Sequence, residues 1–501
     1  MVWIAGPFPL LEPDAMMSRT AASTSPATDD DTLVPLVVDL DGTLIKSDLL
    51  IESFFALLAA QPWRAVMAVT RLRQGKAALK AALADDAAVD LHGVPCSEAV
   101  LAFVRAEKAR GRRVYLASAS DARLVGHLAD QLGLFDGFFG SDGTANLAGP
   151  RKAERLVAEF GTKGFDYIGN DTVDVAVWDV CRRPVAANVP PSLLARMKER
   201  YGDVLDLGGD RPGVRAYLKG LRLHQWLKNV LVFVPLFAAH AFGVAEIATV
   251  LVAFVAFGLA ASSAYHLNDL LDLASDRDHP TKRHRPLASG AVPLLHGALL
   301  VPVLLGLALI TGALVSPVFL LVLAVYYATT LLYSLVLKRR VLVDVMTLAG
   351  LYTVRILGGA AALGVPPSAW LLGFSVFIFL CLAIVKRYIE LVGRLKAEKG
   401  KPKGRGYELG DLSVLGALGG ASGYSAVVVL ALYFNSPEVR ELYNSPGYLW
   451  VVFPVLLYWI SRVLLLAHRG ALHDDPVLFA VKDRVSLISG VIIFLAVMAA
   501  M

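Results

Sequence analysis

The sequence predicts two domains of different kinds, an α/β domain with a parallel sheet followed by an all-helical domain that crosses a membrane repeatedly. The composition is the first observation, because 56% hydrophobic residues and a mean hydropathy of +0.57 are too high for a soluble protein. The second observation is where this excess lies. Residues 32–210 carry ordinary charge and short apolar runs, whereas from about residue 227 long apolar stretches alternate with short polar loops.

Charge and cysteine usage exclude several other classes of protein. The net charge of +5 is modest for 501 residues, so we expect no nucleic-acid partner. The three cysteines lack the spacing of metal ligands, which argues against a disulfide framework or a zinc site. We divide the chain into a disordered leader at 1–31, the α/β domain at 32–210, an interfacial linker at 211–226 and the membrane domain at 227–501.

Polar residues follow the short apolar strand patterns of the α/β domain. The run at 36–38 leads into Asp39 and Asp41, the run at 113–117 leads into Ser118, and the run at 165–168 leads into 169–174, with Lys152 before the last. Strands separated by helical stretches indicate a parallel sheet, whose sites lie at the carboxyl ends of the strands. We therefore expect these residues to share one site, with the mostly helical residues 46–110 forming a small cap that limits substrate size.

These clusters, in this order, resemble those of the haloacid dehalogenase-like phosphatases across about residues 36–190. The resemblance implies that Asp39 attacks phosphorus and that Asp41 acts as the acid and base. It further implies that Ser118 and Lys152 hold the transferring phosphoryl group. Asp39, Asp41 and Asp174 would then bind Mg²⁺.

One position departs from that family's pattern. Asn170 follows the glycine of the last cluster, where the family usually has aspartate. An amide oxygen can bind Mg²⁺ but adds no charge, so we expect either weaker metal binding or compensation by Asp171. A catalytically inactive domain that docks the membrane part to partners is the alternative interpretation.

We expect nine membrane-spanning segments. They are 227–243, 246–266, 292–313, 316–336, 341–362, 369–386, 413–434, 447–467 and 483–501. The loops after the second, fourth, sixth and eighth segments hold nearly all the lysines and arginines of the connecting loops. The positive-inside rule therefore places these loops, the amino terminus and the α/β domain on the cytoplasmic side of a bacterial inner membrane.

Four oxygen-bearing side chains end the second of these segments. Asn268, Asp272 and Asp276 are spaced at i, i+4 and i+8, so one helix would present them on one face, with Asp269 beside them. Acidic groups at a membrane helix end are costly unless they coordinate or pair with something. Carboxylates near lysines and arginines suit a Mg²⁺-bridged diphosphate, because they supply hard oxygen ligands while the cations neutralise phosphate charge.

The NDxxDxxxD pattern of residues 268–276 resembles the first aspartate-rich motif of the UbiA superfamily of intramembrane prenyltransferases. Residues 225–229, the pattern YSxxLK at 333–338, residues 386–390 and the pattern DPVxFAxxDR at 475–484 extend the resemblance over about 220–501. This set is more similar to the decaprenyl-phosphate phosphoribosyltransferases of the superfamily than to its quinone-precursor prenyltransferases.

That resemblance implies a donor, an acceptor and a set of site residues. Phosphoribosyl pyrophosphate would be the donor and a polyprenyl phosphate in the bilayer the acceptor, with Asp272 and Asp276 catalytic and Mg²⁺ held by these two together with Asn268 and Asp269. The substrate-binding residues it implies are Lys228, Asn229, Lys282, Arg283, Arg285, Lys338, Asp344, Arg355, Lys386, Arg387 and Glu390.

The two domains suggest consecutive reactions, because a phosphoribosyl transfer leaves a 5-phosphate that a tethered phosphatase could remove. Two other functions stay open. An aromatic prenyltransferase that takes a prenyl diphosphate donor would use the same aspartate and Mg²⁺ chemistry, with an accessory or inactive phosphatase-like domain. A transporter is less well supported, because the charged groups cluster in loops rather than near the bilayer midplane.

Overall fold

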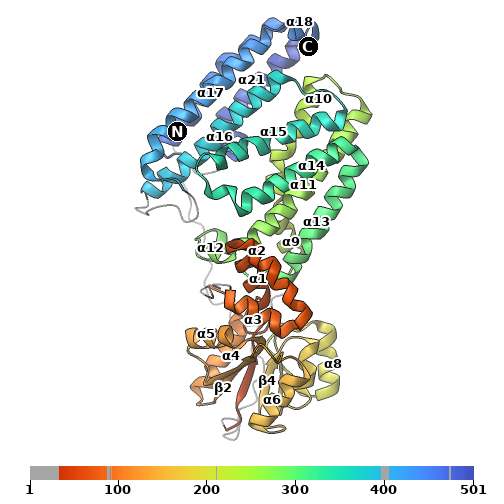
Figure 1. Cartoon of the computed structure of the whole chain (residues 1–501), viewed down its shortest axis with the longest axis vertical. Coiled ribbons are helices and arrows are strands. Elements are labelled where there is room, and N and C mark those ends of the chain that lie inside the picture. The colour runs from red at the N-terminus through yellow and green to blue at the C-terminus, as the bar shows by residue number, and fades with distance from the viewer. Residues whose placement is uncertain (1–32, 87–90, 92, 210–211, 397–405, 473–475) are drawn as a thin grey trace, which may run out of the picture. The chain divides into compact units, whose positions relative to one another are not determined.

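The computed structural model describes residues 33–86, 91, 93–209, 212–396, 406–472 and 476–501, so the expected leader at 1–31 lies outside the described residues. The chain divides into two compact units. The first comprises Met1–Leu50, Ala68–Asp86 and Val94–Arg211, and the second comprises Ile51–Met67, Ala87–Gly93 and Pro212–Met501. Figure 1 labels β2 and β4 of the first unit and most of the long helices of the second.

The first unit is built on one six-stranded sheet, and every pairing in it is parallel. In spatial order the strands are β3 (Gly137–Ser141), β2 (Val114–Asp121), β1 (Leu36–Asp39), β4 (Asp166–Gly169), β5 (Pro184–Ala186) and β6 (Leu205–Asp206). The chain winds outwards from β1 to β3 and then returns to β4 beside β1. This confirms the predicted α/β domain. Sheets of this kind bind ligands where the winding reverses, here between the carboxyl ends of β1 and β4.

Helices connect these strands and complete the core of the first unit. They are α3 (Lys76–Asp86), α4 (Glu98–Ala109), α5 (Ala122–Leu132), α6 (Pro150–Phe160), α7 (Val175–Trp178) and α8 (Pro191–Tyr201). Phe165, Tyr167 and Trp178 are fully buried in the core. Because β1 is buried along its whole length, the side chains that follow it are held in fixed positions.

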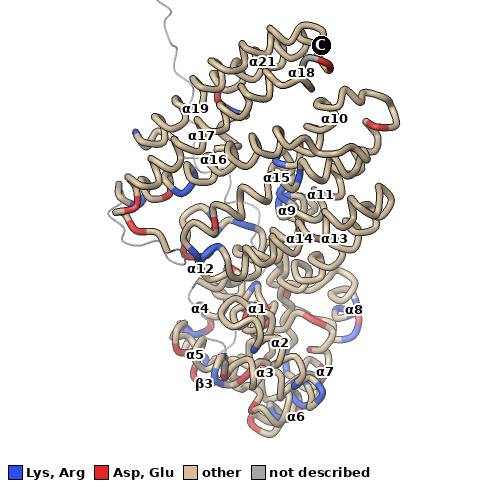
Figure 2. The backbone as a smooth tube through the Cα atoms, turned by 45° about the horizontal axis from the view of Figure 1, so that its top comes forward, with Lys and Arg blue, Asp and Glu red and all other residues tan. Residues whose placement is uncertain are grey.

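The second unit is a bundle of apolar helices, all of them long except α20. They are α11 (Val244–Leu271), α13 (Leu294–Val315), α14 (Pro317–Leu335), α15 (Val343–Leu363), α16 (Ala369–Lys396), α17 (Leu412–Phe434), α19 (Val452–His468), α20 (Pro476–Lys482) and α21 (Arg484–Ala500). Within the described residues, seven helices are long and apolar enough to cross a membrane, or eight if the bent pair α20 and α21 forms one span. Their outer faces are apolar and charged residues gather near the helix ends (Figure 2), as a lipid surround requires.

The prediction of nine membrane helices is not confirmed: among the described residues the first segment forms no long helix, and the last one, α21, counts as a span only together with α20. Residues 227–243 form no single long helix: a 3₁₀ helix, η5 (Leu223–Phe233), is followed by the short α10 (Val234–Ala238). Pro235, which has no amide hydrogen to donate, lies in the first turn of α10. The segment still runs antiparallel to α11, since Trp226 Nε1 donates to Ser262 Oγ at 2.9 Å and Phe233 packs on Phe254.

Helix α1 (Leu49–Ala60) belongs to the second unit from Ile51 onward. The sequence interpretation placed residues 46–110 together in a cap on the α/β domain, whereas the structure groups Ile51–Met67 with the membrane helices. Phe55 lies in a buried cluster with Leu270, Leu273 and Leu287. An apolar face of α1 is therefore covered by the end of α11 and the loop that follows it.

Candidate functional site

The first candidate site lies at the carboxyl end of β1. Asp39, the last residue of β1, accepts hydrogen bonds from Lys152 Nζ at 2.6 Å and from Thr43 Oγ1 at 2.9 Å. Asp41 Oδ2 accepts hydrogen bonds from Ser118 Oγ and Ser120 Oγ, both at 2.8 Å. The sheet thus brings together residues that are up to 113 positions apart in the sequence.

Tyr167 and Asp174 hold the other side of this site. Tyr167 Oη donates to Asp174 Oδ1 at 2.8 Å and accepts a hydrogen bond from Lys152 Nζ at 2.9 Å. Asp174 Oδ2 accepts hydrogen bonds from the backbone amides of Asn170 at 3.0 Å and of Asp171 at 3.1 Å. Asp174 therefore fixes the turn after β4 and orients Lys152 through Tyr167.

The first site carries more negative than positive charge. Asp39, Asp41 and Asp174 face the buried cation Lys152, and burial, opposed by Lys152 and reinforced by the other two carboxylates, raises the pKa of Asp39. Such an excess of carboxylate fits a divalent cation. Of the described residues, no group of three His, Cys, Asp or Glu side chains is placed to hold a metal ion by itself. Backbone, amide or water oxygens would have to complete the ligand shell, and Asn170 lies beside Gly42 at this place.

Lys80 is a residue that the sequence interpretation missed. It extends from α3 and donates to the carbonyl oxygen of Ala119 at 2.6 Å and to Asn146 Oδ1 at 3.0 Å. Ala119 lies between the two serines that bind Asp41, so Lys80 brings a cation close to the site. Burial lowers the pKa of this lysine, although Asp41 opposes the shift. No motif pointed to Lys80, because it stands in an ordinary helical stretch.

The second candidate site is a cavity of about 290 Å³ in the second unit. Six basic residues line it, and none of the described residues in its wall is acidic. The basic residues are Arg222, Lys228, Arg285, Arg355, Lys386 and Arg387. Asn268, Ser334, four tyrosines and seven apolar residues complete the wall. A cavity with this wall favours a ligand that carries several negative charges.

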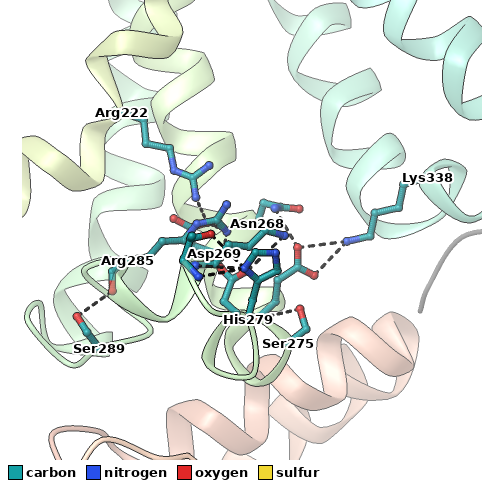
Figure 3. Close-up of polar contacts among 12 residues, drawn as sticks. Arg222, Asn268, Asp269, Ser275, His279, Arg285, Ser289 and Lys338 are labelled. Carbon is teal, nitrogen blue, oxygen red and sulfur yellow. Dashed lines mark hydrogen bonds and ion pairs between the residues drawn. The ribbon is translucent and has the colours of Figure 1, made fainter. Parts of the chain in front are cut away.

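Asp269, in the last turn of α11, and Asp276, which follows this helix, pair with two of these cations (Figure 3). Arg285 Nη1 contacts both Asp269 Oδ1, at 3.1 Å, and Asp276 Oδ2, while Arg222 Nη2 contacts Asp269 Oδ1. Asp269 and Asp276 are almost fully buried. Burial raises the pKa of Asp276, against the opposing effect of Arg285. These two carboxylates hold Arg222 and Arg285 in place at the cavity.

Asp272 points to different partners. Its carboxylate accepts hydrogen bonds from Lys338 Nζ at 3.1 Å and from Asn268 Nδ2 at 3.0 Å. The expected single helix is interrupted here, since α11 ends at Leu271 and α12 (Leu273–Arg277) begins after Asp272. The carboxylates therefore form no ready ligand shell. In the structure Asp269, Asp272 and Asp276 each contact at least one basic side chain.

Arg355 is held deep in the bundle. Its Nε donates to Asn229 Oδ1 at 2.8 Å and its Nη2 donates to Tyr326 Oη at 3.0 Å. Its guanidinium also lies 4.8 Å from the centre of the Tyr326 ring and 5.6 Å from that of Tyr352. Neutral oxygens and aromatic faces orient this cation without cancelling its charge.

Arg387 is paired with acids instead. Its Nε donates to Asp344 Oδ2 at 2.5 Å and its Nη1 donates to Glu390 Oε2 at 2.8 Å. Asp344 is fully buried and also accepts a hydrogen bond from Tyr407 Oη at 2.5 Å. This arrangement gives Asp344 the role of holding Arg387, and the sequence interpretation missed Tyr407.

The family model of the UbiA prenyltransferase family matches residues 229–482, which is just over half of the chain. The chain belongs to the UbiA prenyltransferase family. A Sinorhizobium fredii protein named y4nM is 37% identical to it over 94% of this chain and 92% of that protein.

Two further relatives are shorter. The nodulation protein NoeC of Azorhizobium caulinodans is 37% identical over 54% of this chain and 89% of its own length. The decaprenyl-phosphate phosphoribosyltransferase of Mycolicibacterium smegmatis is 32% identical over 54% of this chain and 88% of its own length. These matches cover nearly all of each relative, so both relatives are too short to hold counterparts of both units.

Solved structures add only distant likenesses. A UbiA homologue from Archaeoglobus fulgidus bound to GPP and Mg²⁺ is 16% identical over 56% of this chain and 99% of that chain, with a TM-score of 0.44. A HAD family hydrolase from Salmonella enterica is 15% identical over 34% of this chain and 68% of that chain, with a TM-score of 0.25. Neither score carries an argument, so the phosphatase interpretation rests on the residues of the first unit.

In this member of the UbiA family, the residues implied by the motifs divide into two groups. Lys228, Arg285, Arg355, Lys386 and Arg387 line the cavity, and Asn229 and Lys338 contact residues that surround it. Lys282 and Arg283 are exposed and are not part of the wall. Arg222, Tyr326 and Tyr333 also line the cavity but were not predicted as site residues. The position of Arg222, three residues before the 225–229 motif, could have indicated it.

Replacing Tyr167 with phenylalanine tests the network of the first site. The substitution leaves Lys152 and Asp174 buried without their shared hydroxyl, so we expect the free energy of unfolding of this unit to fall by about 1–2 kcal/mol. The measurement is the midpoint of thermal unfolding of this unit in the full chain, followed by amide hydrogen exchange in β1 and β4. A midpoint equal to that of the wild type would mean that the hydroxyl contributes no net stability.

Proposed function

We propose that the second unit transfers 5-phosphoribose from phosphoribosyl pyrophosphate to a polyprenyl phosphate, and that the first unit then removes the 5-phosphate from the lipid product. The observation that carries this proposal is the wall of six basic residues around the cavity. A phosphoribosyl donor has a diphosphate at one end and a phosphate at the other, and the acceptor adds a third anionic group. The name of the M. smegmatis relative, a decaprenyl-phosphate phosphoribosyltransferase, agrees with a phosphoribosyl group as the transferred group and a polyprenyl phosphate as the acceptor.

The transfer needs one bond to form and one to break at the anomeric carbon of ribose. An oxygen of the lipid phosphate forms the new bond to this carbon, and the bond to the pyrophosphate oxygen breaks with its electron pair leaving on pyrophosphate. Positive charge develops on the ribose ring and negative charge on the leaving group. Basic residues placed around the diphosphate lower the barrier because they stabilise the charge that develops there.

Arg285 has a special part in this scheme, because it lines the cavity and is held by Asp269 and Asp276. An incoming diphosphate competes with these carboxylates for Arg285. Mg²⁺, when bound with the donor, would be held by the oxygens of Asn268, Asp269, Asp272 and Asp276 and would help to neutralise the pyrophosphate. Lys338, which holds Asp272, lies in the next loop on the same side of the bundle.

We place this side of the second unit in the cytoplasm. The loops after α11, α14, α16 and α19 carry most of the basic residues of the connecting loops, as the positive-inside rule requires. Arg222, at the start of η5, contacts Asp269 at the end of α11, so residues 212–222 lie at this same end of the bundle. Phosphoribosyl pyrophosphate, which is soluble in water, can then reach the cavity from the cytoplasm.

The first unit has the groups that a phosphate-monoester hydrolysis requires. Asp39 attacks phosphorus and becomes an aspartyl phosphate, while Asp41 protonates the leaving oxygen and then activates water. Lys152 and the serines beside Asp41 orient these two carboxylates. Mg²⁺ held by Asp39 with Asp41 and Asp174 nearby would balance the surplus negative charge.

Arg285→Gln tests the cavity as the donor site. The variant loses one cavity cation and the partner of two buried carboxylates, so we expect KM for phosphoribosyl pyrophosphate to rise by roughly tenfold or more. Arg283→Gln, which changes an exposed neighbour outside the cavity wall, should have a much smaller effect. Equal effects of the two variants would show that general loop charge, and not the cavity, binds the donor.

Asp39→Asn tests the order of the two reactions. The variant keeps the size of the side chain but removes the nucleophile, so the phosphoribosyl lipid should accumulate and the free ribosyl lipid should disappear. The measurement is the ratio of the two lipids made from labelled phosphoribosyl pyrophosphate by the full chain in vesicles that contain polyprenyl phosphate. An unchanged ratio would remove the first unit from the pathway, and the absence of any labelled lipid from the wild type would remove the transfer itself.

A further inference from the structure

Helix α1 is joined to the loop after α11 by a buried ion pair. Glu52 Oε1 accepts a hydrogen bond from Arg277 Nη2 at 2.5 Å, and Glu52 Oε2 accepts one from Arg277 Nη1 at 3.2 Å. The side chains of Glu52 and Arg277 are only 6% and 3% exposed. A two-point contact of this kind fixes both the position and the orientation of the guanidinium.

Arg277 extends this constraint to the whole loop. It directly follows Asp276, and its Nε donates to the carbonyl oxygen of Ala288 at 3.2 Å. One guanidinium therefore connects α1, the end of the aspartate motif and the returning part of the loop. If Glu52 lost its charge, Arg277 would remain as a buried cation without its carboxylate partner, and such sites relax by moving the backbone.

The same helix contacts the second loop of the site. Arg339 Nη2 donates to the carbonyl oxygen of Ala59, near the end of α1, at 3.3 Å. Arg339 follows Lys338, which holds Asp272. Leu335, at the end of α14, packs against the apolar cluster that contains Phe55. Thus α1 contacts both loops whose side chains meet in the Asp272–Lys338 pair.

We propose that α1 is a clamp that belongs to the transferase site, and that Glu52 is a positioning residue for the loop that carries Asp269, Asp272 and Asp276. The inference rests on the proposed transfer reaction and deepens it. It means that the transferase of this chain needs a helix encoded within the sequence of the phosphatase-like half.

The test uses the full chain in lipid nanodiscs and compares the wild type with Glu52→Gln, which removes the charge and keeps the shape. Glu98→Gln, an exposed acid of α4 in the first unit, is the matched control. Amide hydrogen exchange is measured in residues 268–293, together with phosphoribosyl transfer and hydrolysis of p-nitrophenyl phosphate. Exchange in this loop should rise by roughly tenfold in Glu52→Gln and stay unchanged in Glu98→Gln.

The activities should separate in the same way. In Glu52→Gln, kcat/KM for phosphoribosyl pyrophosphate should fall by roughly tenfold while p-nitrophenyl phosphate hydrolysis keeps its wild-type rate. The doubly substituted Glu52→Arg, Arg277→Glu chain should regain part of the loop protection, because the ion pair is rebuilt in reverse. Loss of both activities together, without this recovery, would indicate general unfolding and overturn the positioning role.

Unchanged exchange in residues 268–293 of Glu52→Gln overturns the clamp, whatever the transfer rate. A wild type that transfers no phosphoribose refutes the proposed function instead, and the exchange measurement still decides whether α1 holds the loop.

Discussion

The pairing of charges at the end of α11 is the constraint on which the second unit depends. Charged groups at a membrane surface persist only when they are paired or hydrated, and Asp269 and Asp276 are too buried to rely on water. Arg285 satisfies both, and Arg222 adds a second contact to Asp269. As a result, Arg222 and Arg285 line the cavity, and the aspartates that they contact are not part of its wall. Negative ligands are therefore attracted even though the motif itself is acidic.

Two irregular segments, the helix break at Asp272 and the 3₁₀ helix η5, position the side chains of this site. The break at Asp272 turns its carboxylate towards Lys338, away from the partners of Asp276. The 3₁₀ path of η5 carries Lys228 to the cavity wall and buries Asn229 against Arg355. A regular helix over the same residues would follow a different periodicity and would not present these side chains at the same places. Departures from ideal helix geometry thus coincide with the site.

Local patterns in the sequence were sufficient to locate β1, β2 and β4 and most of the membrane helices, but not β3, β5 and β6. The apolar runs that end at Asp39 and at residue 169 mark the ends of β1 and β4 correctly, because a parallel sheet collects its polar residues at one edge. The run expected to end before Ser118 is too short, since β2 continues to Asp121. Long apolar runs identify the membrane spans, because a helix that crosses the hydrocarbon core needs about 20 mostly apolar residues. The prediction of a membrane helix at 227–243 was wrong, because hydropathy measures the length of an apolar run. It does not show whether a run that contains Pro235 can form one continuous helix.

The parts of the sites that could not be predicted depend on contacts between residues far apart in sequence. Glu52 and Arg277 are 225 positions apart, and nothing in the pattern around Glu52 distinguishes it from a solvated acid. Tyr407 and Tyr167 lie outside the polar clusters, and only the fold shows that their hydroxyls hold Asp344 and Asp174. The motif also could not show that the aspartates contact arginines, since spacing along a helix fixes a face but not the partner opposite that face.

The choice of donor tests the central claim most directly, which is that the cavity cations receive a ribose donor with phosphate at both ends. The wild-type chain in vesicles with polyprenyl phosphate and a phenolic acceptor is given labelled phosphoribosyl pyrophosphate and a labelled prenyl diphosphate in separate reactions. The account predicts that phosphoribosyl pyrophosphate is consumed and its label enters lipid, while the prenyl diphosphate stays intact. Consumption of the prenyl diphosphate with phosphoribosyl pyrophosphate untouched would contradict it.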